Sequence, residues 1–211
     1  MTTGSITLCC KSTLASRLAC WWVLACCLLG WSAFAHAGKA ELTALHVERD
    51  DAGVFLTAQV GFTLSPVVED ALTKGIPIHF VAEAEVMRER WYWYDRAVAT
   101  AHRYMRVSYQ PLTRRWRLNT SADPLVSTGL GVSLSQGYDS LEEVMAAVQR
   151  VGRWKVADTE DIAGSGRHVL RFRFRLDVGQ LPRALQLGSA GQSDWAVSVE
   201  RRIDLTQEPG Q

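Results

Sequence analysis

The sequence has no cysteine after its first 37 residues. All five cysteines precede that point: Cys9, Cys10, Cys20, Cys26 and Cys27. The remaining part, residues 38–211, therefore forms no disulfide and offers no thiol for nucleophilic catalysis or metal binding. A chain of these 174 residues buries roughly 70% of the surface that its unfolded state exposes, so it needs no disulfide to hold a core. We expect residues 38–211 to form a single β-rich domain.

Neither sign of charge is in excess. The chain has 23 Lys and Arg against 22 Asp and Glu, and taking away Lys11 and Arg17 of the first 37 residues leaves 21 against 22. This balance gives no electrostatic footprint for nucleic acid, and we expect no nucleic-acid partner. Lysine is scarce, since 18 of the 21 cations in residues 38–211 are arginine. Arginine forms planar bidentate contacts and stacks on rings, although a GC-rich genome would also favour its codons.

The first 37 residues lack acids, and they carry two cations before an apolar run at 18–35. This order is typical of a signal peptide, and alternating alanines place the cleavage after Ala37. We therefore predict a periplasmic protein whose mature chain begins near Gly38. An uncleaved helix anchored in the inner membrane is the alternative, because 18 apolar residues reach the lower limit of a membrane span. Lipid attachment at Cys26 is disfavoured, since it would leave an apolar mature terminus.

Catalytic motifs are absent from residues 38–211. The sequence has no G-x-S-x-G nucleophile elbow and no H-E-x-x-H zinc motif. A G-x-G at Gly129 and Gly131 is followed by Leu134 where a phosphate-binding loop needs its third glycine. We therefore expect no cofactor and name no catalytic residue. An active site assembled from distant positions stays open, because it leaves no local motif.

The histidines lack the spacing of metal ligands. His79, Glu83 and Glu85 share one face of a predicted strand, but His79 and Glu83 would stand about 13 Å apart, too far to hold one ion. Three other histidines have no second histidine four residues away: His46, His102 and His168. We expect no metal site and interpret these side chains as surface or hydrogen-bonded histidines.

Alternation of apolar and polar residues is the strongest pattern in the chain. It is clearest at 168–178, HVLRFRFRLDV, where the apolar residues point to one face and the arginines to the other. The same pattern predicts strands at 54–64, 76–87, about 97–109, 114–118 and 194–205. Turns at 50–53 and 110–113 are short enough for antiparallel pairing.

Helical signals are few and brief. A serine–proline pair at Ser65 starts one helix that ends before Gly75, and a capping box starts a second helix over 140–152. A third short helix is predicted over 180–187. The expected fold class is α+β: a mostly antiparallel, sandwich-like β-structure of about eight strands with two or three short helices.

The stretch RERWYWYD, residues 88–95, is the most unusual in the chain. We expect it to continue the strand that begins at Ile76, with a bulge near Met87 that exchanges the two faces. Three interpretations stay open: a strand end that packs on the core and its rim, an aromatic binding groove, and a seat at a membrane interface. The candidate binding residues are Arg88, Arg90, Trp91, Tyr92, Trp93 and Tyr94.

The predicted strand 168–178 also carries a ladder of arginines on its polar face: Arg171, Arg173 and Arg175. Acids on neighbouring strands would neutralise this ladder through cross-strand pairs. The acids in question are Glu83, Glu85 and Glu200. The other interpretation is a binding face for an anion or an acidic partner, which adds the three arginines to the candidate binding residues.

Four segments resemble an uncharacterised proteobacterial exported family, the domain of unknown function 4390. They are RERWYWYDR (88–96), RYMRVSYQPLTRRWRL (103–118), HVLRFRFRLDVGQLPRALQL (168–187) and SDW (193–195). The resemblance covers nearly all of residues 40–205, and the family has no established activity. It implies an envelope protein whose gene often lies beside a nitrogen-type sensor histidine kinase. The last predicted strand departs from the family, because VSVERRIDL lacks a tryptophan expected in relatives.

The leading hypothesis is a non-enzymatic periplasmic accessory protein that binds an envelope partner through its aromatic and arginine residues. The resemblance makes the outer domain of a sensor kinase the candidate partner, and contact with the membrane is expected only through an uncleaved signal segment. The alternative is an envelope hydrolase whose active site no sequence motif reveals. A third possibility is a purely structural protein, which would display no exposed aromatic patch.

Overall fold

The computed structural model describes residues 40–89, 95–124, 133–163, 166–183, 185 and 195–205. The chain divides after His36, and all of these residues belong to the second unit, Ala37–Gln211. The predicted signal peptide lies outside them. No helix among the described residues has the length and apolar character needed to cross a membrane.

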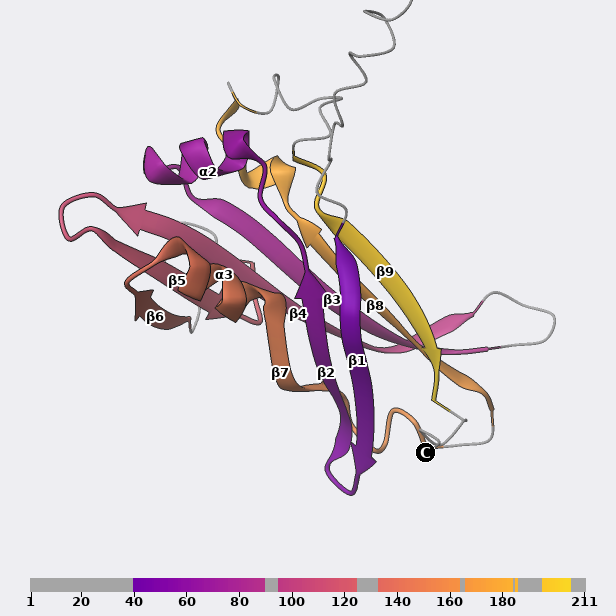
Figure 1. Ribbon diagram of the computed structural model, residues 1–211. Coiled ribbons are helices and arrows are strands. Elements are labelled where there is room, and N and C mark those ends of the chain that lie inside the picture. Colours follow the sequence, from indigo (N-terminus) through magenta and orange to yellow (C-terminus); the bar gives the residue numbers. More distant parts are fainter. Residues whose placement is uncertain are drawn as a thin grey trace, which may run out of the picture. The chain divides into compact units, whose positions relative to one another are not determined.

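Nine strands of the described part form two antiparallel sheets (Figure 1). The first has three strands in the order β1 (Glu41–Asp50), β2 (Gly53–Gly61) and β7 (Arg150–Ala157). The second has six in the order β6 (Leu134–Tyr138), β5 (Arg115–Ser121), β4 (Arg96–Gln110), β3 (Ile78–Arg88), β8 (His168–Leu176) and β9 (Ser198–Asp204). The predicted fold class, a mostly antiparallel sandwich-like α+β protein, is confirmed.

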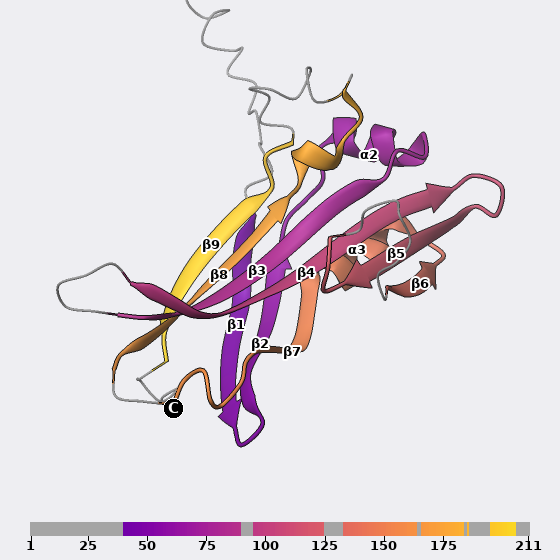
Figure 2. The same cartoon turned by 180° about the vertical axis from the view of Figure 1, so that it is seen from behind.

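The core lies between the two sheets, which Figures 1 and 2 show as layers from opposite sides. Alternation along β2, β3 and β8 turns one row of apolar side chains from each strand inward, as the sequence predicts. Phe62, Phe80 and Phe174 meet at the centre with ring centroids 5.6–5.8 Å apart. All described core residues lie between Ala40 and Leu205, so residues 38–211 contain the elements of their own core.

Two short helices follow serine caps. In α2 (Pro66–Thr73) the Ser65 hydroxyl accepts a hydrogen bond from the Val68 amide at 3.3 Å, and proline occupies the first turn. In α3 (Leu141–Gln149) the Ser140 hydroxyl accepts from the Glu143 amide at 3.1 Å. The prediction that this helix reaches residue 152 is wrong, because the chain enters β7 at Arg150.

Of the third predicted helix, 180–187, residues 180–183 and 185 belong to the described part, and Arg183 and Leu185 among them are helical; residues 184, 186 and 187 lie outside it. The Leu185 amide donates to the Pro182 carbonyl oxygen at 2.9 Å. A 3-10 turn, η1 (Val178–Gln180), stands at its start. The register of β3 and β4 shifts near Met87, as predicted, but the extra residue is Val98 of β4, and β3 keeps its register with β8. The predicted exchange of faces in the aromatic stretch lies outside the described residues. The last strand starts at Ser198, four residues later than predicted.

Candidate functional site

The aromatic stretch joins β3 to β4. Its described neighbours form the last described pair of the ladder, Arg88 opposite Arg96, and the described part of β3 ends at Arg88. The prediction that the strand continues through the aromatic residues concerns a segment outside the described part of the chain. Arg90, Trp91, Tyr92, Trp93 and Tyr94 lie outside the described residues.

Arg88, the first candidate binding residue, is used within the fold. Its Nε donates to Nε2 of His168 at 3.3 Å, and one terminal nitrogen donates to the Ala163 carbonyl oxygen at 3.3 Å. Burial, and next the charge of Arg88, lower the pKa of His168, which favours the neutral imidazole that accepts this bond. Arg88 thereby fastens the end of β3 to the connection between β7 and β8.

The backbone of this connection passes close to the Arg88 side chain. Gly166 has φ +148°, a conformation that favours glycine, and a Cβ there would lie 3.4 Å from two carbons of the Arg88 side chain. The Glu89 amide donates to the Arg167 carbonyl oxygen at 2.9 Å. Sequence reasoning missed this role, because Arg88 and its partners are 75 to 80 residues apart.

The arginine ladder of β8 is neutralised within the sheet. Arg171 bonds to Glu85, directly opposite it on β3. Arg173 lies 3.2 Å from Glu200 on β9 and 3.7 Å from Glu83 on β3. Arg175 lies 3.6 Å from Asp177. The predicted pairs with Glu83, Glu85 and Glu200 are confirmed, and they explain how three cations stand side by side on one strand.

A second group of arginines was not singled out from the sequence. The hairpin of β4 and β5 with its flanking residues, 96–122, contains six arginines and no acid. Among the described residues, one of the six forms an ion pair: Arg115, 2.8 Å from Asp139. Arg103 instead lies over the Trp154 ring, 5.2 Å from its centroid, and burial lowers the pKa of Arg103. The signal was present in the sequence, but it appears only when charge is counted element by element.

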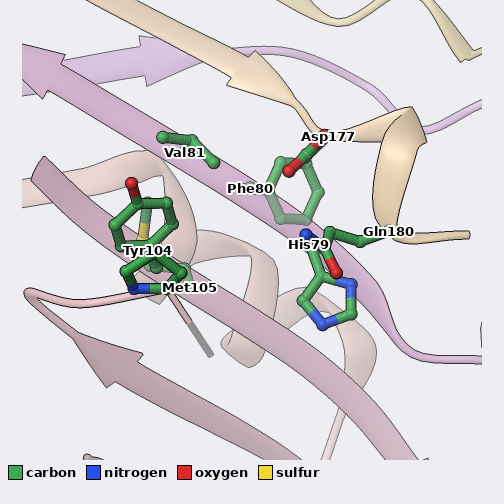
Figure 3. A pocket seen from close by; sticks show the side chains of 8 residues that line it. His79, Phe80, Val81, Tyr104, Met105, Asp177 and Gln180 are labelled. Atoms are coloured by element: carbon green, nitrogen blue, oxygen red, sulfur yellow. The ribbon is translucent and has the colours of Figure 1, made fainter. Parts of the chain in front are cut away.

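A small cavity lies on the outward face of β3 and β4 (Figure 3). Its volume is about 20 Å³, the space of one water molecule. His79 and Asp177 gather on one side of it and Tyr104 lies on the other. Burial, and then the charge of Arg106, lower the pKa of His79, while Asp177 opposes them. No serine, threonine or cysteine stands among the described residues that line the cavity.

Buried polar atoms without a partner cluster on the same face. Within the described part of the chain, four buried side-chain atoms make no hydrogen bond: Nδ1 of His79, Nδ1 of His102, Nε of Arg106 and Oδ1 of Asn119. Arg106 stands between His79 and Asn119 in the strand register. Water satisfies such atoms in most proteins, so this face has polar groups left over for solvent or a ligand.

A shallow recess of about 370 Å³ lies where β4 approaches β7. Lys155 and Asp158 line it and form an ion pair at 2.5 Å. No cluster of three metal-ligating side chains occurs among the residues that the structure describes.

Comparison with known proteins identifies the family and goes no further. The family model described as Domain of unknown function (DUF4390) matches residues 37–204. No curated protein and no solved structure matches the chain. The match spans every strand described above and more than half of the sequence, so the chain belongs to the DUF4390 family.

Proposed function

We propose that this chain is a non-enzymatic accessory protein, exported to the periplasm, that binds an envelope partner through the segment between β3 and β4. The supporting observation is that the described core is already filled by other rings. Phe80 and Phe174 are fully buried, Phe62 nearly so, and the cavity beside Phe80 has room for about one water. The last described pair of the β3–β4 ladder next to this segment is Arg88 opposite Arg96.

The composition of the segment supports recognition. Tryptophan, tyrosine and arginine carry most of the energy in protein interfaces, because each presents a large, stiff surface with a polar end. Two tryptophans and two tyrosines follow Arg90 without interruption. Arg88 and the arginines of β8 have partners within the fold. The proposal therefore assigns binding to Arg90, Trp91, Tyr92, Trp93 and Tyr94.

The outer domain of a sensor histidine kinase is the first partner to test. Residues 38–211, tagged at the carboxyl end, would be used to capture that domain and to purify partners from envelope extracts. Trp91→Ala with Trp93→Ala should abolish the capture and leave the unfolding midpoint unchanged. Phe55→Ala is the matched control, because it removes a partly exposed ring from the outward face of β2. A folded double variant that retains every partner would refute the proposal.

A further inference from the structure

The positive charge of the chain is concentrated on the β4–β5 hairpin. Residues 96–122 carry six arginines and no Asp or Glu, although the whole chain is nearly neutral. Four of these arginines have neither an ion pair nor a ring contact within the described part of the chain: Arg96, Arg106, Arg114 and Arg117. The arginines of β8, in contrast, each form an ion pair with an acid. The hairpin therefore presents arginines that are not neutralised by acids of the described part and that can contact a negatively charged partner.

An apolar side chain stands at the end of this hairpin. Leu112, in the turn between β4 and β5, is 101% exposed, more than any other large apolar side chain of the described residues. Arg114 and Arg117 follow it and are also exposed. We call these three residues the tip patch. In Figure 1 the turn that carries Leu112 projects beyond the other strands of its sheet.

The tip patch is held in shape by the strands below it. Tyr109 and Trp116 face each other across the ladder with ring centroids 4.8 Å apart, and Trp116 is 7% exposed. The Thr113 hydroxyl donates to the Gln110 side-chain oxygen at 3.3 Å. Arg114 takes a positive φ of 52°, which closes the turn. A braced turn loses little conformational entropy when it docks.

We propose that the tip patch docks on an anionic lipid surface, with Leu112 entering the boundary between headgroups and acyl chains and the arginines contacting the phosphates. A single protruding leucine needs surroundings that close around it on all sides. Fluid acyl chains do this without a preformed pocket, whereas a protein partner would need a matching cavity. Cations set just behind an apolar tip match the charge of an anionic headgroup layer.

This site is independent of the segment proposed above for a protein partner. β4 has 15 residues, from Arg96 at the aromatic end to Gln110 at the tip, which corresponds to roughly 50 Å of extended strand. The tip patch and the aromatic segment thus lie at opposite ends of one strand. Substitutions in one of them leave the other intact, so the two proposals can be tested separately.

The test is co-sedimentation of residues 38–211, which contain their own core, with lipid vesicles. Vesicles of phosphatidylcholine and phosphatidylglycerol should bind the protein, and vesicles of phosphatidylcholine alone should not. Leu112→Ser should lower the partition coefficient about tenfold. Arg114→Ser with Arg117→Ser should lower it about 25-fold, and added salt should lower it for the unmodified protein.

Leu134→Ser is the matched control. Leu134 is also exposed, at 64%, and lies on β6 of the same sheet, opposite Thr120 and away from the turn. Its replacement should leave vesicle binding unchanged. The proposal is overturned if anionic vesicles fail to bind the protein, if Leu112→Ser and Leu134→Ser weaken binding equally, or if the arginine variant binds as well as the original. Circular dichroism confirms that each variant is folded.

Discussion

Replacing Arg171 by glutamine separates a structural role of the β8 arginines from a binding role. The side chains of Arg171 and Glu85 are 24% and 19% exposed, so water screens their ion pair less than it screens an exposed one. An exposed pair contributes about 0.2–1 kcal/mol, and loss of a half-buried partner also leaves a carboxylate without its hydrogen bond. We therefore expect Arg171→Gln to lower the free energy of unfolding by about 1–2 kcal/mol.

Arg175→Gln is the comparison. Its side chain is 43% exposed and its acid, Asp177, lies 3.6 Å away, so we expect a loss of about 0.5 kcal/mol or less. Urea titration followed by tryptophan fluorescence measures both losses, with an unchanged slope as evidence that the denatured state is the same. In a cycle with Glu85→Gln, the coupling energy to Arg171 should be about 1 kcal/mol.

Two results would refute the structural reading of the ladder. One is an equal loss of stability in the Arg171 and Arg175 variants, which would mean that burial of the pair has no effect. The other is a variant with Gln at all three positions, Arg171, Arg173 and Arg175, that keeps its stability and loses an envelope partner. That outcome would show that the three arginines bind the partner.

Three further predictions concern the core, a turn and a histidine. Phe174→Ala removes a fully buried ring that contacts Phe62 and Phe80, so the urea titration should show a loss of about 3–5 kcal/mol; a loss below about 1 kcal/mol would contradict the packing. Gly53 has φ +138° and a Cβ there would lie 2.2 Å from the Ala157 carbonyl oxygen, so Gly53→Ala should cost about 2 kcal/mol or more and lower the melting temperature. Burial lowers the pKa of His168 below its ordinary value of 6.5, so the unfolded state binds the proton more tightly and stability is lost as the pH falls below about 6.5. His168→Gln should reduce that slope in melting temperatures measured between about pH 7.5 and 5, and an unchanged slope would contradict the assignment.

The parts of the fold that sequence predicted well are those where burial differs sharply between the two faces of a strand. In β8 every second residue is buried and the others are half-exposed, so alternation identifies it directly. β1 and β7 were missed for different reasons. β1 lies at a sheet edge and has no buried residue, so its pattern is weak. The start of β7 was assigned to the preceding helix, because Val151 continues the apolar stripe of α3 before the chain turns into the strand.

In the candidate site too, the sequence predicted contacts that follow from the pattern of neighbouring strands and missed those between residues far apart in the chain. Cross-strand pairing predicted the partners of Arg171 and Arg173, because acids and arginines occupy matching faces of β3 and β8. The role of Arg88 depends on His168 and Ala163, which only the folded chain brings near. Whether acids neutralise the arginines of the β4–β5 hairpin also depends on strand order. The residues of 96–122 do not themselves indicate which strands, and so which acids, lie beside them.

The register of the six-stranded sheet decides where charge remains uncompensated. Glu83 and Glu85 of β3 lie between β4 on one side and β8 on the other. Toward β4 they face His102 and Thr100, and toward β8 they face Arg173 and Arg171.

The acids therefore neutralise β8, and none of them reaches the far half of β4. There Arg106 stands between His79 and Asn119, and Arg117 of β5 faces Ser108 and Gly137, neither of which carries charge. A chain with 23 cations and 22 acids thus carries a positive region at one end of a sheet without any excess in its composition. Such an asymmetric charge distribution orients a protein toward an anionic surface before contact, because the field of the hairpin extends about one Debye length, roughly 8 Å at physiological salt.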